Sequence, residues 1–408
     1  MSGASATEIE ADEADVRHRE ALDERLRSAA AAGVRDWQAL LVAADGADPR
    51  LVARRVAALR APVTEPPTEP PATPPWTPEL HALDFEWYFE PACATELAAH
   101  LLETRVDRGT VPGAVGAGGV LCLGTPTVAF ALLADPRCPR VTLVDANPLA
   151  AQRGPSSSLL HSINDDLAAA RIEAGRYDAA IFDAPWYPAE LLRWLAVAAR
   201  GVRMGGRIMF VLPRPLHRPR APEDRRQVLE AARRLGPVTV QPGRLRYSSP
   251  RFEREALATA GVRTPAAWRR ADLVELVLHR EPGPIPPAPS ARPPWRRFVV
   301  GSQVVHLDLS APDLPGDPLA PLPGTSSHRY ASISTRDPLR DRIGLWTSRS
   351  RVAQVRRPAF VAALLEHLAQ AGDLRGLERT PQLRASSTEE RRRVLASMRS
   401  ILGSGRSP

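Results

Sequence analysis

The chain has 408 residues, 44% of them hydrophobic and 25% charged, which predicts two or three units of a globular protein. No run of about eighteen residues is both apolar and uncharged, and residues 1–20 are acidic and polar, so we expect neither a membrane span nor a secretory signal. Cys93, Cys122 and Cys138 lack metal-ligand or Cys-x-x-Cys spacing, and the nine histidines are scattered. We therefore expect a cytoplasmic protein without disulfides and without a metal site.

The net charge of +8 at pH 7 invites a nucleic-acid-binding interpretation. All 54 basic residues are arginines, however, in a chain that is also rich in alanine and proline. This composition indicates the codon bias of a GC-rich genome, which explains much of the arginine excess. The charge is thus a weak argument for nucleic acid, although arginine is the better residue for bidentate phosphate contacts.

Two proline-rich linkers divide the chain. Residues 1–60 predict a small helical region, because apolar residues recur at helical spacing between Glu8 and Arg60. The linkers at 61–78 and 281–296 are expected to be extended, since each proline lacks a donor and restricts its neighbour. The remaining chain then forms a central domain at 79–280 and a mixed α+β region with a frayed tail at 297–408.

Short apolar runs alternate with helical patterns through the central domain. The runs typical of strands are 120–123, 141–144, 179–182, 207–212, 238–240 and 273–278. Helical patterns occupy 91–102, 127–133, 188–199 and 222–235. This alternation predicts right-handed βαβ crossovers and an α/β fold with a Rossmann-like, doubly wound, mostly parallel sheet.

The first strand run leads into Gly124-Thr125-Pro126. A strand that enters a glycine turn and then a helix places the backbone of Gly124 and Thr125 where a cofactor can approach closely. Only one glycine of the Gly-x-Gly-x-x-Gly fingerprint is present, and Pro126 replaces the second, which argues against a pyrophosphate cradle. A cofactor without pyrophosphate, such as S-adenosylmethionine, needs less of this turn. An ordinary strand–helix corner is the alternative.

Carboxylates follow the next two strands. Asp145 ends the second run, 21 residues after Gly124, where a carboxylate can accept both ribose hydroxyls of a cofactor. A turn or helix cap is the usual role of such an aspartate. Asp165 and Asp166 stand about where a third strand would end, and either could accept from an adenine amine or cap a helix.

The strand expected at 179–182 leads into Asp183-Ala184-Pro185-Trp186-Tyr187. An exocyclic amine conjugated to a nucleobase is a poor nucleophile, so groups that accept its protons help it to attack. A carboxylate and a backbone carbonyl fixed by proline are such groups, and an aromatic ring can stack on an extruded base. A strand–helix turn with a buried tryptophan is the alternative interpretation.

This segment resembles the Asp/Asn-Pro-Pro-aromatic motif of class I S-adenosylmethionine-dependent methyltransferases that act on amino groups of nucleic acids, including N6-adenine. The resemblance implies that Asp183 and the carbonyl of Ala184 accept the protons of the amine. It also implies that Pro185 fixes the turn and that Trp186 or Tyr187 stacks on the base. Ala184 stands where the family has its first proline, which keeps the carbonyl and loses rigidity.

An upstream segment, Phe85-Glu86-Trp87-Tyr88-Phe89-Glu90-Pro91, resembles the tyrosine–aromatic–Thr–Pro element of the same family. By this resemblance Tyr88, Phe89 and Pro91 pack on the methionine moiety of the cofactor, with Glu90 where threonine is usual. The resemblance covers roughly residues 84–213, about a third of the chain. The cofactor that it implies is S-adenosylmethionine, and the implied substrate is DNA or RNA.

Three functions remain open from the sequence. The leading one is an S-adenosylmethionine-dependent transferase that methylates an exocyclic amine of nucleic acid, most simply N6 of adenine. The second is an aminopropyltransferase-type polyamine enzyme on the same fold, and the third is an inactive scaffold, with Pro126 and Ala184 as signs of decay. Arg214, Arg218 and Arg220 follow the fifth strand, where they could contact phosphates.

The C-terminal region carries weaker patterns. Residues 298–309 alternate as strand residues do, and 357–371 form an amphipathic helical pattern. We expect the rest of the chain to Pro408 to be irregular, with an arginine-rich, frayed end.

Overall fold

The computed structural model describes residues 6–60, 63–64, 79–84, 86–106, 118–147, 154–164, 167, 171–265, 267–286, 295–310, 313–325, 327–330, 337–371, 377–378 and 380–403. The chain divides into two units. Unit 1 comprises Met1–Thr77, Trp87–Ser249 and Val262–Pro289, and unit 2 comprises Pro78–Glu86, Pro250–Gly261 and Ser290–Pro408. Among the helices described, none combines the length and apolar character needed to cross a membrane.

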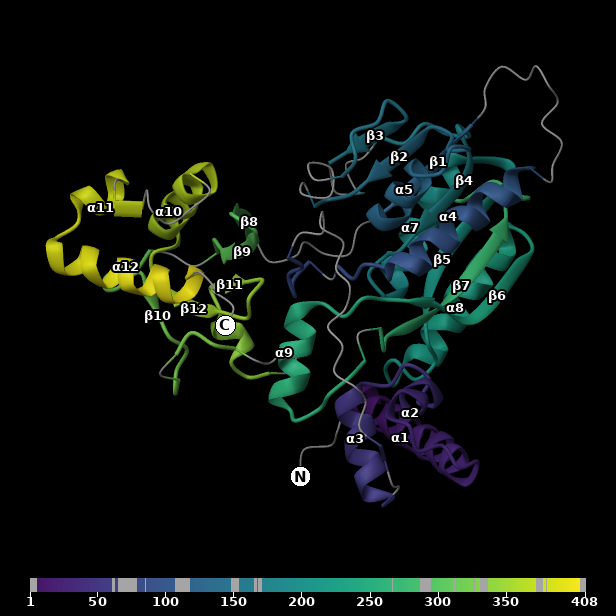
Figure 1. The fold of residues 1–408 in the computed structure, drawn as a ribbon, viewed down its shortest axis with the longest axis horizontal. Coiled ribbons are helices and arrows are strands. Elements are labelled where there is room, and N and C mark those ends of the chain that lie inside the picture. The colour runs from purple at the N-terminus through teal and green to yellow at the C-terminus, as the bar shows by residue number, and fades with distance from the viewer. Residues whose placement is uncertain are drawn as a thin grey trace. The chain divides into compact units, whose positions relative to one another are not determined.

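Unit 1 is built on a seven-stranded sheet with the order β3-β2-β1-β4-β5-β7-β6 (Figure 1). The strands are β1 (Gly119–Leu123), β2 (Val141–Val144), β3 (Leu160–Ile163), β4 (Tyr177–Phe182), β5 (Val202–Pro213), β6 (Val238–Arg246) and β7 (Arg270–Val277). Neighbours from β3 to β5 are parallel, whereas β7 is antiparallel to both β5 and β6. The six predicted strands and the mostly parallel, Rossmann-like sheet are thus confirmed.

Helices cover both faces of this sheet. They are α4 (Pro91–Val106) and α5 (Pro126–Leu133) on one face and α7 (Pro188–Gly201) and α8 (Ala221–Leu235) on the other. All four agree with the predicted helices. Because the central strands β1, β2 and β4 are covered on both sides, their residues read as nearly continuous apolar runs rather than as an alternating pattern.

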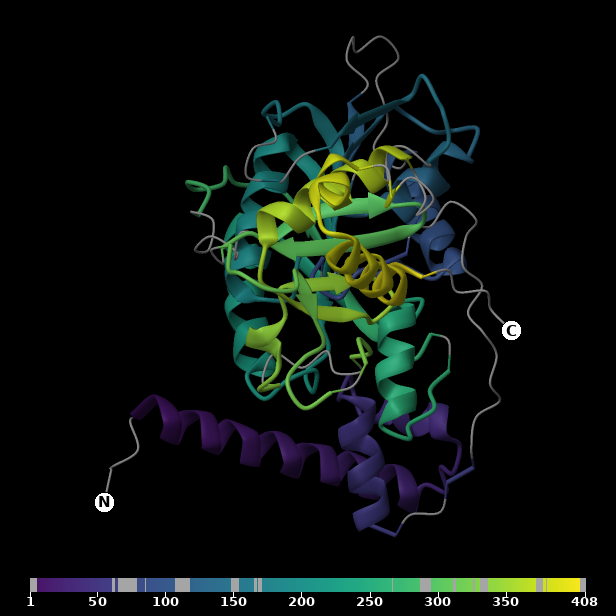
Figure 2. The ribbon, with the colours of Figure 1, turned by 90° about the vertical axis from the view of Figure 1, so that its left-hand side faces the viewer.

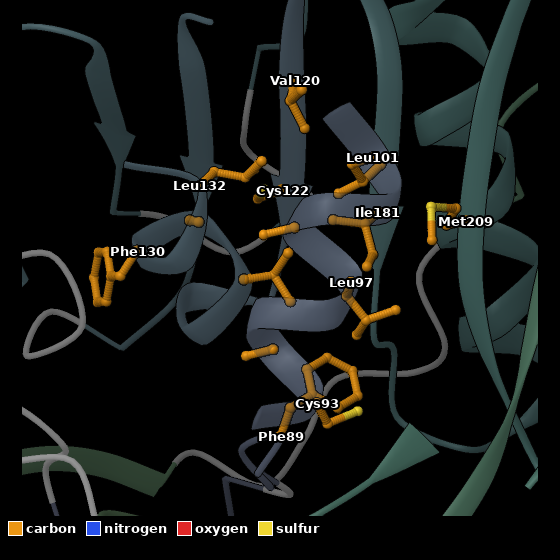
Figure 3. Close-up of a cluster of buried hydrophobic side chains, with 14 of the residues drawn as sticks. Phe89, Cys93, Leu97, Leu101, Val120, Cys122, Phe130, Leu132, Ile181 and Met209 are labelled. Atoms are coloured by element: carbon orange, nitrogen blue, oxygen red, sulfur yellow. The ribbon is translucent and has the colours of Figure 1, made fainter. Parts of the chain in front are cut away.

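The alternation of side chains along the strands separates two cores. Cys122 of β1 packs under α4 and α5, whereas its neighbour Leu121 packs under α7 and α8. Figure 3 shows the first core, in which Leu97 of α4 lies near Ile181 of β4 and Met209 of β5. The two cores hold the ends of the central strands rigidly, and the candidate site is built on those ends.

The predicted N-terminal helical region consists of α1 (Ala6–Ala31), α2 (Trp37–Ala43) and α3 (Pro49–Ala58). An aspartate caps α2 and another caps α3. Arg55 of α3 donates to Asp23 of α1 at 2.7 Å, where the two helices cross (Figure 2). The indole N–H of Trp37 donates to the carbonyl of Arg263 at 2.6 Å, which fastens these helices to the remainder of unit 1.

The order of the strands places a switch point between β1 and β4. From β1 the chain winds outward through β2 and β3 on one side, and through β4 and β5 on the other. Open α/β sheets bind their ligands at such a switch point, outside the carboxyl ends of the strands. Gly124 and Asp183, which follow β1 and β4, both lie at this point.

Unit 2 has an antiparallel sheet with the order β10-β12-β11-β9-β8. Its strands are β8 (Trp295–Val300), β9 (Gln303–Asp308), β10 (Leu319–Ala320), β11 (Leu345–Thr347) and β12 (Val352–Val355). Its helices are α9 (Arg251–Thr259), the short 3-10 helix η1 (Arg340–Arg342), α10 (Pro358–Ala371), α11 (Pro381–Ala385) and α12 (Thr388–Leu402). Figure 2 shows α10 and α12, in yellow, against the sheet, and one apolar cluster joins Leu307 of β9, Leu364 of α10 and Met398 of α12.

The strand pattern over residues 298–309 is confirmed, but the turn within it was not predicted: the chain reverses at Gly301 and Ser302 and forms the hairpin β8–β9. Gly301 has a φ of +62°, the left-handed conformation that tight hairpin turns favour. An alternating pattern continues through such a turn without a break, so periodicity alone does not reveal it. The helix predicted at 357–371 is confirmed as α10.

Our prediction of an irregular tail is wrong, since α11 and α12 lie beyond residue 380. The Ser387 side chain caps α12 by accepting from the N–H of Glu390 at 3.2 Å, and the first turn is acidic, as the helix dipole favours. Val394, Met398 and Ile401 follow at helical spacing and are buried. Arginines fill the exposed positions of this helix and obscure its apolar stripe in the sequence.

Candidate active site

Backbone hydrogen bonds hold the residues at the strand ends in one row. The N–H of Asp183 donates to the carbonyl of Leu123 at 3.3 Å, and the N–H of Gly124 donates to the carbonyl of Val144 at 2.9 Å. These bonds continue the parallel ladder by one residue beyond β1 and β4. The Asp183 side chain therefore starts from a fixed backbone at the switch point.

The Asp183 carboxylate accepts two hydrogen bonds from aromatic side chains. The phenol of Tyr247 donates to Oδ2 at 2.7 Å, and the indole N–H of Trp186 donates to Oδ1 at 3.3 Å. Burial raises the pKa of Asp183 to about 7, although these two donors and the positive charge of Arg269 act in the opposite direction. The residue still keeps part of its surface accessible. Near neutral pH it is therefore a half-ionised carboxyl that can accept or return a proton.

Tyr247 is positioned by the chain that follows β6. Its backbone forms an antiparallel bridge with Phe89, and its ring lies 4.9 Å from the Phe89 ring. The Tyr247 side chain is fully buried, and burial and the nearby Asp183 raise its pKa well above the ordinary value. The phenol consequently stays protonated and acts as a permanent donor to the carboxylate.

Three indoles surround the guanidinium of Arg269, which precedes β7. Its central carbon lies 4.0 Å from the ring centroid of Trp87, 4.5 Å from that of Trp186 and 6.0 Å from that of Trp268. These distances are those of cation–π contacts. Because β7 is antiparallel, its first residues lie at the edge where the parallel strands end. The positive charge of Arg269 thus lies beside Asp183, among the rings of Trp87, Trp186 and Trp268, which we call the aromatic wall.

His217 completes this wall from the loop after β5. Its ring lies 4.7 Å from the Trp186 ring at an interplanar angle of 80°. Burial, and after it the charges of Arg269 and Arg218, holds the pKa of His217 well below its ordinary value. A neutral imidazole therefore packs edge-on against Trp186 at physiological pH.

Sequence reasoning does not identify Tyr247 or Arg269, because both lie in the connection between β6 and β7, which contains α9 and has no motif spacing. The only signal for Arg269 in the sequence is the pair Trp268-Arg269 just before the strand β7, which is antiparallel to β5. Trp87 belongs to the upstream aromatic segment, but its role beside Arg269 does not follow from the sequence.

Gly124 has a φ of +60°, as a glycine corner requires. A Cβ at this position would lie 2.9 Å from the Trp194 ring and 3.2 Å from the Asp183 carbonyl oxygen. The close packing of the corner against α7 is thus a reason for glycine additional to the cofactor approach predicted from the sequence. Thr125 is buried.

We expect Gly124→Ala to destabilise the protein more than Gly175→Ala. Both glycines have positive φ, but a Cβ at Gly175 meets no atom within 4 Å. Gly175→Ala should cost about 1–2 kcal/mol from backbone strain alone, and Gly124→Ala should cost a further 1–3 kcal/mol or so from overpacking. Thermal unfolding of the two variants measures the difference, and equal losses would show that Trp194 moves aside without cost.

Asp145 follows β2, as predicted, and its backbone N–H donates to the carbonyl of Ile163 at 3.1 Å. Its Oδ1 accepts from the N–H of Asn147 at 2.7 Å, the geometry of an aspartate turn. The turn-forming role is therefore present, and it also fixes the direction of the carboxylate. Ribose binding by Asp145 stays a prediction. Asp165 and Asp166 lie outside the described residues.

The other predicted site residues divide into two groups. Ala184 is buried, Pro185 accepts from the N–H of Tyr187 at 2.7 Å in a tight turn, and Tyr187 is 47% exposed before α7. Tyr88 and Phe89 are buried, and Pro91 begins α4. This segment contacts Tyr247 through the backbone bridge between Phe89 and Tyr247. Cofactor contact by these three residues stays a prediction.

Phosphate contact by Arg214, Arg218 and Arg220 stays a prediction, and the first two are already paired with carboxylates of the chain. Arg214 pairs with the buried Asp45 and Asp272, and Arg218 pairs with Asp224 at 2.8 Å. These ion pairs fix the two guanidiniums in the loop after β5. Arg220 is exposed immediately before α8.

In unit 2, His81, Asp84 and His306 bring ligand atoms within 4.8 Å of one another. The His81 ring is already bonded at both nitrogens, to the N–H of Leu83 and to the carbonyl of Trp346, each at 3.0 Å. Asp84 pairs with His306 at 2.7 Å and with the Arg297 guanidinium at 3.1 Å. This set fits a self-contained buried ion pair better than a metal site, because no lone pair of His81 is available and a cation already neutralises Asp84.

Comparison with known proteins finds similar solved structures but no matching sequence family. No family model matches it, and no curated protein matches its sequence. The branched-chain polyamine synthase of Thermus thermophilus, solved with N4-aminopropylspermidine and 5'-methylthioadenosine, is similar with a TM-score of 0.48 and 16% identity, over 66% of this chain and 90% of that one.

Two RNA methyltransferases are similar over shorter lengths. The 16S rRNA N2 G1207 methyltransferase RsmC of T. thermophilus, solved with AdoMet and guanosine, has a TM-score of 0.28 and 19% identity, over 55% of this chain and 50% of that one. The tRNA (m1A58) methyltransferase TrmI of Aquifex aeolicus has a TM-score of 0.30 and 15% identity, over 48% of this chain and 71% of that one.

Proposed function

We propose that unit 1 is an S-adenosylmethionine-dependent transferase that methylates an amine, and that the amine is an exocyclic one of a nucleic-acid base, such as N6 of adenine. The observation that carries this proposal is the Asp183 carboxyl. It stands at the switch point of the sheet, it has a pKa of about 7, and aromatic side chains surround it. A carboxyl with this pKa and position suits proton transfer from an amine.

In the proposed reaction the acceptor nitrogen attacks the sulfonium methyl carbon. The N–C bond forms as the C–S bond breaks, sulfur keeps the electron pair, and a proton leaves the nitrogen for a base. S-adenosylmethionine supplies the electrophilic methyl group when bound. Asp183 is the base, because each of its oxygens accepts one bond from Tyr247 or Trp186 and keeps a second lone pair for the amine.

The chain has groups that suit the cofactor at the neighbouring strand ends. The Asp145 carboxylate, held by its turn, would accept the ribose hydroxyls, and the Gly124 corner would lie against the cofactor backbone. Arg269 lies over the Trp186 ring at 4.5 Å and Arg218 over the Tyr187 ring at 4.9 Å, so an unstacked base would have to stack on the opposite face of either ring. Asp165 and Asp166 are proposed as further cofactor contacts from the sequence alone.

Aminopropyl transfer to a polyamine is the second candidate, because aromatic rings surround the Asp183 carboxylate. Indole and phenol faces attract cations, and here Trp87, Trp186 and Tyr247 lie around one carboxylate. An acidic group beside aromatic rings is also what a protonated polyamine would need. The two candidates share the fold and the carboxylate and differ in the acceptor.

We expect label to pass from methyl-labelled S-adenosylmethionine to nucleic acid when the full chain is incubated with separate DNA, RNA, protein and polyamine pools. The matched arm uses decarboxylated S-adenosylmethionine labelled in its aminopropyl group. Label in the polyamine pool of that arm alone would replace methylation by aminopropyl transfer. Calorimetry with both cofactors accompanies the assay, and failure to bind either would favour an inactive scaffold.

A further inference from the structure

The loop after β5 contacts the rings of Trp186 and Tyr187. The His217 ring lies 4.7 Å from the Trp186 ring, and the guanidinium carbon of Arg218 lies 4.9 Å from the ring centroid of Tyr187. Because β5 is parallel to β4, this loop leaves the sheet at the same edge as the candidate site. The conformation of residues 214–218 therefore affects the position of the two rings that we assign to the acceptor.

The N-terminal helical region holds this loop at Leu216. The Leu216 N–H donates to the carbonyl of Asp45 at 3.0 Å, and the Leu216 carbonyl accepts from Nε2 of His18 in α1 at 2.9 Å. His18 and Leu216 are both buried, and a buried backbone group that loses its partner is costly. The middle of the loop thus stays in place only while α1 and the turn between α2 and α3 are bonded to it.

Asp45 has an unusual backbone conformation at this contact. Its φ is +54°, which is uncommon for a residue with a Cβ, and such conformations persist where the surroundings over-determine them, as they do at functional sites. The Asp45 carboxylate is buried and pairs with Arg214 of the loop and, at 2.9 Å, with Arg25 of α1. A Cβ on Gly46 would lie 2.5 Å from the Cβ of Arg214, so the turn and the loop pack directly against each other.

We propose that the N-terminal helical region is part of the acceptor side of the site, with His18 and Asp45 as positioning residues that hold the loop after β5 for the acceptor. The loop lies on the β5 side of β4, whereas Gly124 and Asp145, which we assign to the cofactor, follow β1 and β2 on the other side. We therefore expect the two residues to affect acceptor binding and not cofactor binding. The inference rests on the proposed function, because it concerns the acceptor of the reaction assigned to Asp183.

A loosened loop should raise the KM for the acceptor rather than lower kcat. When only a fraction of the molecules holds the loop in place, the apparent affinity for the acceptor falls by that fraction. A saturating acceptor selects the molecules with an ordered loop, so turnover recovers. The reaction centre itself is not altered, because Asp183 keeps its bonds from Tyr247 and Trp186.

The test compares two substitutions of His18. His18→Ala removes the donor to the Leu216 carbonyl, whereas His18→Gln keeps an amide donor of similar reach. The control is His279→Ala, since His279 is an exposed histidine of unit 1. The acceptor is a short single-stranded oligonucleotide, used with methyl-labelled S-adenosylmethionine.

We expect His18→Ala to raise the KM for the oligonucleotide about ten-fold, with kcat within about two-fold of the wild type and the Kd for S-adenosylmethionine unchanged. His18→Gln should restore the KM, and His279→Ala should change none of the three quantities.

Hydrogen exchange of backbone amides tests the loop without turnover. In His18→Ala we expect residues 214–218 to exchange about ten-fold faster than in the wild type, while β5 exchanges at the wild-type rate. Asp45→Asn is a second variant, because asparagine tolerates a positive φ and keeps the backbone acceptor but loses the charge that pairs with Arg214. It should act in the same direction, and it replaces His18→Ala as the test if that variant does not fold.

The outcomes separate this inference from the proposed function. Unchanged exchange of residues 214–218 in both variants would overturn the positioning role. Faster exchange with an unchanged oligonucleotide KM would overturn the link to the acceptor, and so would equally faster exchange in β5, which indicates general destabilisation. A wild type that transfers methyl groups to no pool would reject the proposed function, and selective loosening of the loop would then still support the positioning role of His18.

Discussion

Asp183→Asn is expected to cut turnover by roughly two orders of magnitude or more, the range for loss of one positioned acid–base or electrostatic group. The amide keeps the size of the carboxyl and one acceptor oxygen, but it does not take the proton of the amine. The affinity for S-adenosylmethionine should barely change, because the proposed ribose contact is at Asp145. Steady-state kinetics with the acceptor found in the label assay, together with calorimetry, measure both quantities.

The same variant should be more stable than the wild type above about pH 7. Asp183 has a folded-state pKa raised to about 7, above the ordinary 3.8 of the unfolded chain. The stability that this group contributes is fully present below pH 3.8, and it is lost as the pH rises through 7. Asparagine does not ionise, so the difference in melting temperature between the variant and the wild type should grow from pH 4 to pH 7.

The control for both measurements is Asp178→Asn at the other end of β4. Asp178 pairs with Arg203 at 2.7 Å, and the arginine is 56% exposed. This variant should retain activity and show no gain in stability at high pH. Full activity in Asp183→Ala would remove the strand end from the catalytic centre, whereas full activity in Asp183→Asn alone would remove only the carboxylate role.

The pKa of Asp183 also predicts the pH dependence of the wild-type reaction. A base with a pKa of about 7 is half protonated at that pH, so the rate should rise with pH and level off above about 8. Tyr247 stays protonated over the whole range, so it adds no limb of its own.

Strand ends are the part of the site that the sequence could predict. Buried parallel strands read as apolar runs, and Asp183, Gly124 and Asp145 stand directly after three such runs, so their meeting at one edge follows from the topology. No comparable rule exists for Tyr247 and Arg269. They reach the edge through β6 and β7, whose antiparallel insertion beside β5 is set by packing over the whole sheet.

The errors of prediction have different physical causes. The β8–β9 hairpin was hidden because a two-residue turn preserves the alternation of the strands on either side of it. Helix α12 was not predicted, because an arginine-rich segment is commonly an indication of disorder. Arginine is abundant throughout the chain, so an arginine-rich segment does not indicate disorder here. The ion pairs of Arg214 do not follow from the sequence either, because its partners Asp45 and Asp272 come from segments more than fifty residues away.

Asp272→Asn is expected to have the largest effect on stability. The Asp272 side chain is 1% exposed, and it accepts from the N–H of Gly243 at 2.7 Å and pairs with Arg225 at 2.7 Å and with Arg214. Loss of its charge leaves two partly buried guanidiniums with less compensation, since Arg214 retains only Asp45. Breaking a buried pair in this way costs about 3–5 kcal/mol, which lowers the melting temperature by roughly 6–20 °C in a domain of this size.

The matched control is Glu223→Gln, because Glu223 pairs with Arg226 and both side chains are 61% exposed. An exposed pair contributes about 0–1 kcal/mol, so this variant should melt close to the wild type. Arg214 precedes the loop that places His217 against Trp186, so Asp272→Asn should also weaken activity at temperatures where the chain is still folded. A melting temperature within a degree of the wild type would mean that water reaches the two arginines, and the loop after β5 would then be held by Asp45 alone.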